Sequence, residues 1–445
     1  MSPTDTTELT GLRGRMIHAP VYGALEEWRD GVVLWDGAGR IVDVGHAASL
    51  LPRHPDVRID DMRPALVLPG LIDAHTHLPQ YPAAGAGSGD LLPWLHRNIF
   101  PMERRFRAAE AEALAPLFFR DLAANGTTTA GIYLAVWEDS AEVCFQHAEA
   151  AGLRVSMGKV MMDDETYSDT APTRVIDQSL EETDRLCRKW HGQDGGRIRY
   201  AVSPRFAVAC SLALMRGAAE IAAWYDAGIQ THLSENIDEL KAIADRFPDA
   251  LDYTDVYARC GLLGPRTVMG HAIHLSDRER ETLGVTGTRV AHCPTSNFYL
   301  ASGMMALDAL RTAGVAVGLG SDVAGGPDLN MWRVMRGAIE TRNARSALTK
   351  GVAPLLARHA FHLATLGGAQ ALGVTDTAGS LAEGKEADIL VVDPSAVAPP
   401  EAAVEAMDAD EVLSLCVWRG DDRMTVAAYV RGRKLDVRSL NLEVG

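Results

Sequence analysis

The segment PGLIDAHTHLPQY, residues 69–81, starts as a buried apolar strand and then places two histidines one residue apart. An extended chain points alternate side chains to opposite faces, so His75 and His77 face the same way. Two neutral imidazoles on one face can bind one metal ion. The pair could instead be two core histidines hydrogen-bonded to backbone, which is the commoner situation of a lone histidine. The rest of the chain must decide between these interpretations.

Around this segment, the chain alternates short β-branched runs with stretches of helical apolar spacing. The runs lie at 67–72, 127–134, 153–160, 197–203, 228–233, 266–271, 288–293 and 315–320. Strands that alternate with helices predict parallel βαβ units, and this number of them predicts a closed (β/α)8 TIM barrel of the α/β class over residues 67–375. Helices are expected over 103–124 and 140–151, and Ser276 with Glu279 predicts a capping box.

The two flanks differ from this central part. Residues 1–66 and 376–445 contain short apolar runs separated by Gly and Asp turns. We expect them to pair into one small β-sandwich-like domain built from both ends of the chain. They could also be strands that decorate the barrel.

Bulk composition limits the possible partners and location. Against 59 Asp and Glu the chain has 43 Lys and Arg, a formal charge of −16 that disfavours nucleic acid and anionic lipid. The N-terminus shows no signal peptide and no stretch resembles a membrane span, which predicts a cytoplasmic protein. The six cysteines are scattered and are expected to be reduced and mostly buried.

Polar side chains able to bind a metal follow several of the predicted strands, and the carboxyl ends of barrel strands meet at one face. Arg205 follows the fourth strand, and His232 and His271 end the fifth and sixth. Asp322 follows the eighth. Nitrogen and oxygen ligands suited to Zn²⁺ are thus offered by His75, His77, His232 and Asp322.

Such a site predicts hydrolysis. A bound metal lowers the pKa of its water from about 15.7 to about 7, which supplies hydroxide at neutral pH. Asp322 can accept the proton of that water, and Glu235, three residues after His232, is a candidate acid and base. Glu235 could instead be a helix N-terminal acid, and His271 a core histidine. His274 and His292 are expected to be structural.

Several motifs carry a family resemblance that extends over essentially the whole chain. PGLIDAHTH, THLSEN, GHAIHLSD, AHCPTSN and GSDVAGG resemble the amidohydrolase superfamily of metal-dependent (β/α)8 hydrolases. Within that superfamily, the chain resembles the guanine deaminases in the segments HTHLPQY (75–81), LLPWLHRNIFPMERRF (91–106), GKVMMD (158–163), SPRFAVACS (203–211), LATLGGAQALG (363–373) and RGDDRM (419–424).

This resemblance implies the reaction and the roles of the site residues. It implies one zinc ion on the four ligands, Glu235 as the proton shuttle to the purine and the departing ammonia, and His271 as the group that orients water or the tetrahedral intermediate. The substrate guanine would be held by Gln80 and Arg205, with Phe206 lining the pocket and Trp94 as a further wall. It also implies a homodimer.

The chemistry of the residues agrees with this implication. Guanine O6 and N7 are neighbouring acceptors that a guanidinium can contact bidentately. Adenine offers a donor at position six, so an unpaired Arg205 would penalise it. A salt-bridged surface arginine is the alternative for Arg205. Other hypotheses for the chain are a related amino-heterocycle deaminase or hydrolase acting on 8-oxoguanine, pterins or triazines, and a metal-free binding scaffold.

Overall fold

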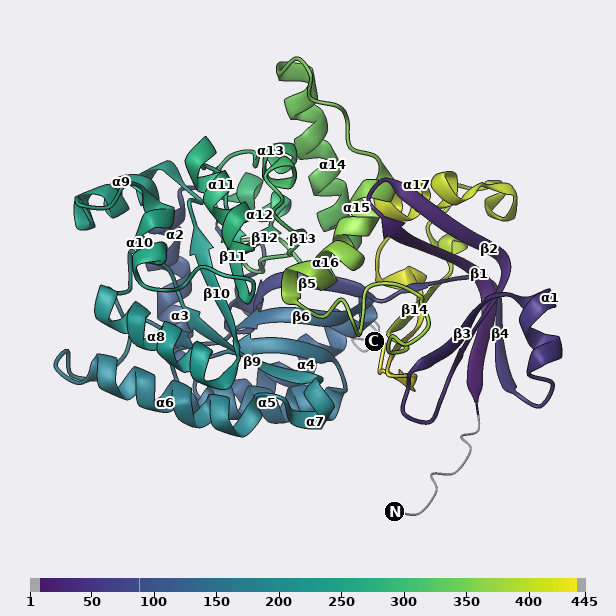
Figure 1. Ribbon diagram of the computed structural model, residues 1–445, viewed down its shortest axis with the longest axis horizontal. Helices are drawn as coiled ribbons and strands as arrows, with labels where there is room; N and C mark the ends of the chain where they lie inside the picture. The colour runs from purple at the N-terminus through teal and green to yellow at the C-terminus, as the bar shows by residue number, and fades with distance from the viewer. Residues whose placement is uncertain (1–8, 88, 438–445) are drawn as a thin grey trace.

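The computed structural model describes residues 9–87 and 89–437, which form a barrel and a smaller sheet beside it (Figure 1). The barrel strands pair in parallel and in sequence order, with the two-residue strand β8 (Val160–Met161) pairing β9. They are β5 (Leu71–His77), β6 (Thr127–Tyr133), β7 (Arg154–Gly158), β9 (Ile198–Pro204), β10 (Gly228–Leu233), β11 (Thr267–His271), β12 (Arg289–His292) and β13 (Val317–Leu319). The predicted (β/α)8 barrel is confirmed.

The first and last strands of the barrel come together at the site of the HxH segment. The backbone N–H of Asp322 donates to the carbonyl of His75 at 2.8 Å, and the N–H of Ser321 donates to the Asp73 carboxyl at 3.0 Å. These bonds carry the segment after β13 alongside β5. Every residue of β5 and β6 is buried, because helices cover the outer face and side chains fill the inside.

Helices follow the strands around the outside of the barrel (Figure 1). They are α4 (Ala108–Ala124), α5 (Glu138–Ala151), α6 (Val175–Trp190), α7 (Gln193–Gly196), α8 (Leu212–Tyr225), α9 (Ile237–Arg246), α10 (Tyr253–Arg259), α11 (Asp277–Thr286), α12 (Pro294–Tyr299), α13 (Leu307–Thr312), α14 (Met331–Leu348), α15 (Ala357–Ala364) and α16 (Leu366–Leu372). The capping box predicted at Ser276 and Glu279 opens α11. Gly152, with φ of 81°, ends α5.

The helix predicted over 103–124 is wrong at its start. The chain forms α3 (Phe100–Arg105), breaks at Phe106, and begins α4 two residues later. Phe106 leaves helical geometry and is buried, and the Glu110 carboxylate accepts from the backbone N–H of Arg107, which starts a new helix. Before α3, short helical turns span the segment after β5: η2 (Leu78–Ala83), α2 (Leu91–Trp94) and η3 (Leu95–Ile99).

Both ends of the chain build the smaller sheet, as predicted. Its hydrogen-bonded order is β16-β15-β14-β4-β1-β2-β3. The strands are β1 (Thr10–Val21), β2 (Ala24–Trp35), β3 (Ile41–His46), β4 (Arg58–Pro69), β14 (Ile389–Val392), β15 (Thr425–Val430) and β16 (Arg433–Lys434), with α1 (Ala47–Leu50), η1 (Leu51–Arg53), η4 (Pro394–Ala396), η5 (Val404–Ala406), α17 (Ala409–Arg419) and η6 (Asp422–Met424) around them. β4 thus lies between the N-terminal strand β1 and the C-terminal strand β14.

The strand predicted over 67–72 is really parts of two strands. β4 ends at Pro69 in the small sheet and β5 begins at Leu71 in the barrel. Gly70 makes the change of sheet, and a Cβ there would lie 2.1 Å from the Thr128 hydroxyl. Both strands are apolar up to this glycine, so hydrophobic pattern alone cannot separate them.

A buried ion network joins the barrel to the small sheet. Arg154 on β7 pairs with Asp388 at 2.9 Å and with Glu386, and Arg431 pairs with Glu386 at 2.6 Å. The six cysteines are free and buried, as expected. Among the helices of residues 9–87 and 89–437, none is long and apolar enough to cross a membrane.

Candidate active site

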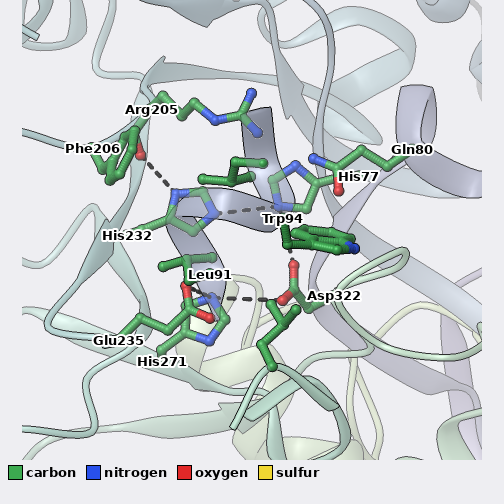
Figure 2. A pocket seen from close by; sticks show the side chains of 12 residues that line it. His77, Gln80, Leu91, Trp94, Arg205, Phe206, His232, Glu235, His271 and Asp322 are labelled. Atoms are coloured by element: carbon green, nitrogen blue, oxygen red, sulfur yellow. Dashed lines mark hydrogen bonds and ion pairs between the residues drawn. The ribbon is translucent and has the colours of Figure 1, made fainter. Parts of the chain in front are cut away.

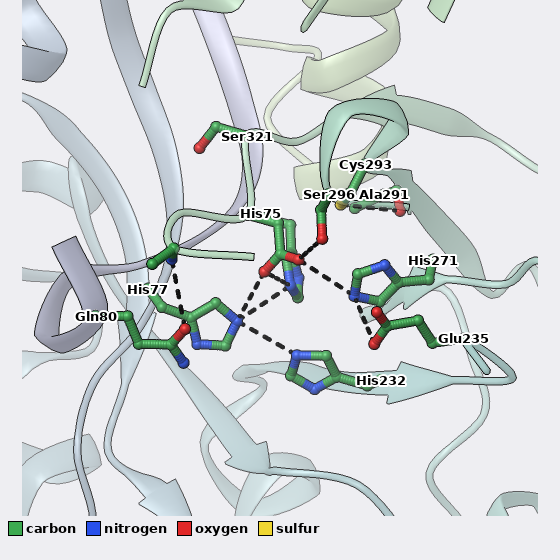
Figure 3. A network of polar contacts seen from close by, with 12 residues as sticks. His75, His77, Gln80, His232, Glu235, His271, Ala291, Cys293, Ser296 and Ser321 are labelled. Carbon is green, nitrogen blue, oxygen red and sulfur yellow. Dashed lines mark hydrogen bonds and ion pairs between the residues drawn. The ribbon is translucent and has the colours of Figure 1, made fainter. Parts of the chain in front are cut away.

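The structure brings His75, His77, His232 and Asp322 together at the carboxyl ends of three strands. Figure 3 shows the three histidines pointing toward one another. Their ligand atoms all lie within 4.8 Å of one another and all four side chains are buried. The Nε2 atoms of His75 and His77 are 3.3 Å apart, as are those of His77 and His232. Asp322 Oδ1 lies 3.2 Å from Nε2 of both His75 and His77.

The environment favours the protonation states that metal ligands need. Burial lowers the pKa of His75 to about 4 and that of His232 well below its ordinary value, so both imidazoles are neutral at pH 7. Burial alone would raise the pKa of Asp322, but hydrogen bonds from His75 and His77 bring it well below its ordinary value. Three imidazoles with a carboxylate are a donor set that fits a divalent transition metal.

Two of these candidate metal ligands are oriented by partners behind them. His232 Nδ1 lies 2.7 Å from the carbonyl of Arg205, so this nitrogen donates and Nε2 is left for a metal. The Ser296 hydroxyl donates to Asp322 Oδ2 at 2.6 Å. These partners fix the tautomer of His232 and the direction of the Asp322 carboxylate.

Glu235 and His271 lie beside the four candidate metal ligands and are not among them. Glu235 Oε2 is 3.4 Å from His271 Nε2, and Glu235 Oε1 accepts from the Ser302 hydroxyl at 3.1 Å. His271 Nδ1 is 2.9 Å from the side-chain oxygen of Asn297. Burial raises the pKa of Glu235 to about 7. A carboxyl that titrates near neutral pH in a buried site is suited to both giving and taking a proton.

Backbone strain is concentrated at the same strand ends. The non-glycine residues Ser234, His271, Ala272 and Asp322 have φ of 49°, 67°, 49° and 50°. Left-handed backbone costs such residues roughly 1–2 kcal/mol each, and it persists where the surrounding structure holds it. Here all four residues lie at or just beyond the carboxyl ends of β10, β11 and β13, where the candidate site is.

A cavity opens onto these groups (Figure 2). The predicted substrate residues Gln80, Trp94, Arg205 and Phe206 all line it. Its other lining residues are His77, Leu91, Leu95, His232, Glu235, His271, Leu300 and Asp322. The cavity is therefore apolar on its walls and polar at two places, the ligand cluster and the Gln80–Arg205 side.

Arg205 is 3% exposed, so it is not a surface arginine. Its Nη1 donates to Glu103 Oε2 at 2.5 Å, and Gln80 Nε2 donates to Glu103 Oε1 at 2.8 Å. The pKa of Arg205 is raised, because Glu103 outweighs the effect of burial. One buried carboxylate therefore contacts both polar residues on this side of the cavity.

Sequence reasoning did not assign roles to Glu103, Asn297 and Ser302. Glu103 lies inside the motif 91–106 and Asn297 inside AHCPTSN, so the sequence marked the segments but not the contacts. Each acts on a residue far away in the chain, which only the fold shows. His274 and His292 lie outside the cavity: His274 Nε2 is 2.7 Å from the Ser302 carbonyl, and burial lowers the pKa of His292 to about 3.

Comparisons with known proteins agree with this arrangement. The sequence matches the Amidohydrolase family over residues 66–427. It is 35% identical to guanine deaminase of Escherichia coli over 93% of this chain and 92% of that protein, and 32% identical to guanine deaminase of Homo sapiens over 95% and 96%. The solved structure of guanine deaminase from C. acetobutylicum, with bound guanine in its active site, matches with a TM-score of 0.89 at 30% identity, covering 96% of this chain and all of the other.

Proposed function

The chain belongs to the amidohydrolase family, and from that premise we propose that it is a guanine deaminase, which hydrolyses guanine to xanthine and ammonia. The observation that carries the proposal is the cavity itself. It has a His3Asp cluster with Glu235 at one place and the Gln80–Arg205 pair at the other. A planar heterocycle held by the pair would place an exocyclic amine beside the cluster.

We propose that His75, His77, His232 and Asp322 hold one Zn²⁺ ion. Three imidazole nitrogens and one carboxylate oxygen form a donor set that suits zinc and leaves room for water. When bound, such an ion acts as a Lewis acid that makes water a nucleophile near neutral pH. Elemental analysis of the purified chain should find about one zinc per chain.

The side chains around the cluster handle the protons. We propose that Asp322 accepts a proton from the attacking water and that Glu235 delivers protons to the ring nitrogen next to the reacting carbon and to the departing amine. Its pKa of about 7 allows Glu235 to do both at neutral pH. His271, held by Asn297, would stabilise negative charge that develops beside it.

The opposite side of the cavity would recognise the purine. Arg205 donors would meet O6 and N7 of guanine, while Phe206 and Trp94 would form apolar walls on the ring. Adenine carries a donor at position six, so the Arg205 N–H groups that Glu103 does not take would face a donor in a buried site, which discriminates strongly. A homodimer and a cytoplasmic location stay predictions.

Ammonia release across a panel of heterocycles tests this proposal. With guanine, 8-oxoguanine, cytosine, adenine, a pterin and a triazine as substrates, kcat/KM should be highest for guanine, by a factor of about 10² or more over adenine. A higher kcat/KM for a pterin or a triazine would show that this compound, and not guanine, is the substrate. No ammonia from any of them, together with zinc-free protein, would instead support the binding scaffold.

A further inference from the structure

We propose that Glu103 is a positioning residue that sets substrate specificity by fixing which way the Gln80 amide faces. The inference rests on the proposed deaminase function. It assigns to Glu103 the choice of substrate class: heterocycles in which a ring N–H stands next to a carbonyl, and not those with an unprotonated ring nitrogen at that position.

Glu103 is placed to act through its neighbours and not on the substrate. It lies on α3, is 1% exposed and stands behind the cavity that Gln80 and Arg205 line. Its two carboxylate oxygens are each taken by one of these residues, at 2.8 Å and 2.5 Å. Its backbone carbonyl accepts from the Trp137 indole N–H at 3.1 Å, which anchors the residue.

The chemistry of a carboxylate fixes the orientation of the amide. A carboxylate in an ion pair with arginine only accepts hydrogen bonds, so the Gln80 atom that faces Glu103 must be the nitrogen. The Gln80 oxygen is then turned the other way, where its protein partner is the backbone N–H of Ala324 at the long distance of 3.4 Å (Figure 3). Gln80 therefore presents an acceptor with a free lone pair beside the cavity.

Arg205 presents the opposite character. Glu103 occupies its Nη1, and the remaining N–H groups of the guanidinium are donors. An acceptor next to donors is complementary to a cyclic amide edge, which pairs a ring N–H with a carbonyl. Guanine has this edge at N1 and O6, whereas adenine has the reverse arrangement of an acceptor N1 and a donor at position six.

The substitution Glu103→Gln tests the orienting role directly. It keeps an acceptor for Arg205 but replaces the acceptor that faces Gln80 by a donor. The new amide oxygen still accepts from Arg205, and its N–H₂ group then faces Gln80. Gln80 satisfies that donor best by turning its own oxygen toward it, which presents its N–H₂ group to the cavity. A donor would then oppose the ring N–H of guanine.

The experiment compares guanine with 2-aminopurine, which has the same amine at C2 but an unprotonated N1 and no carbonyl. In Glu103→Gln, kcat/KM for guanine should fall by about 10- to 100-fold, mainly through KM, while the value for 2-aminopurine holds or rises. Because 2-aminopurine lacks the carbonyl, it binds more weakly than guanine to both the unchanged protein and the variant. This loss cancels when the two proteins are compared. An equal fall for both substrates would show that Glu103 only maintains the structure, and would overturn the inference.

Two further variants keep the test decisive. Gln80→Ala alone should lower the guanine to 2-aminopurine ratio, and adding Glu103→Gln to it should change the ratio no further, because the amide through which Glu103 acts is gone. A further shift in that double variant would contradict the inference. If Glu103→Gln does not fold, an unchanged guanine to 2-aminopurine ratio in Gln80→Ala would still overturn the inference, because Glu103 is proposed to act through that amide.

Asp388→Asn is the matched control, because Asp388 is also a buried carboxylate paired with an arginine, Arg154, but does not line the cavity. Its substrate ratio should equal that of the unchanged protein. If the unchanged protein does not deaminate guanine, the proposed function fails. If it does and Glu103→Gln leaves the ratio unchanged, only the inference about Glu103 fails.

Discussion

Glu235 is the residue on which the proposed proton transfers depend most. It is buried beside the four candidate metal ligands and is not among them. Glu235→Gln should therefore lower kcat for guanine by about 10² to 10⁴, the usual size of general acid and base catalysis, with zinc content unchanged. Ammonia release and metal analysis measure the two effects. Glu220→Gln, at an exposed position of α8, is the control, and normal turnover in Glu235→Gln would remove this carboxyl from the mechanism.

Ser302 tunes Glu235 through one hydrogen bond. Burial raises the pKa of Glu235 to about 7. The hydrogen bond from the Ser302 hydroxyl favours the ionised carboxyl and so opposes this rise. In Ser302→Ala that donation is lost, so the pKa rises and the limb of the pH–rate profile due to Glu235 should move to higher pH. The profile of kcat/KM against pH measures this shift. A limb that stays in place, or moves to lower pH, would contradict the contact.

At the scale of elements, the close approach of Gly270 on β11 to His75 on β5 sets the position of a candidate metal ligand. A Cβ on Gly270 would lie 2.8 Å from Cε1 and 3.1 Å from Nδ1 of His75. Gly270→Ala should therefore push this imidazole aside and weaken metal binding by about 10- to 100-fold. Competition with a chelator measures the affinity. Gly228→Ala at the start of β10, where the nearest atom is 3.7 Å away, should leave it unchanged.

The order of elements could be predicted from sequence because each barrel strand is a short β-branched run between helical patterns. The ends of elements were less accessible. β4 and β5 read as one run because both are apolar on each side of Gly70, and α3 and α4 read as one helix because helical spacing continues through Phe106. In both places a local backbone change, and no change in hydrophobicity, makes the boundary.

In the candidate site, too, some residues could be predicted from the sequence and others could not. Residues at strand ends could be found because a barrel gathers such ends at one face, and the structure places His75, His77, His232 and Asp322 together. Glu103 could not be found this way, because it lies on a short helix after an irregular segment. Its contacts with Gln80 and Arg205 depend on three-dimensional packing that periodicity does not encode.

At the scale of the whole molecule, the network around Glu386 links barrel and small sheet. Burial alone would raise the pKa of Glu386, but Arg431 and Arg154 lower it below its ordinary value of 4.5. A lowered folded-state pKa stabilises the protein above pH 4.5, and this contribution is lost as the pH falls through the folded value. Glu386→Gln should thus cost about 1–3 kcal/mol of unfolding free energy at pH 7 and less at acid pH.

Denaturant unfolding at pH 7 and below pH 4 measures this difference. Glu405→Gln, at an exposed position in the small-sheet part, should change the unfolding free energy little at either pH. An equal loss for Glu386→Gln at both pH values would show that the ion pairs are not the source of the stabilisation.

The position of β4 has a consequence for biosynthesis. Leu66 to Pro69 pair with Ile389 to Val392, which leave the ribosome only after the whole barrel has been translated. At about 5–20 residues per second, the backbone of β4 waits tens of seconds for its neighbour. During that time the unpaired edge of this apolar strand can associate with other nascent chains or bind a chaperone. Polypeptides that terminate before β14 should therefore be recovered in aggregates, even though the proposed zinc ligands are already present in them.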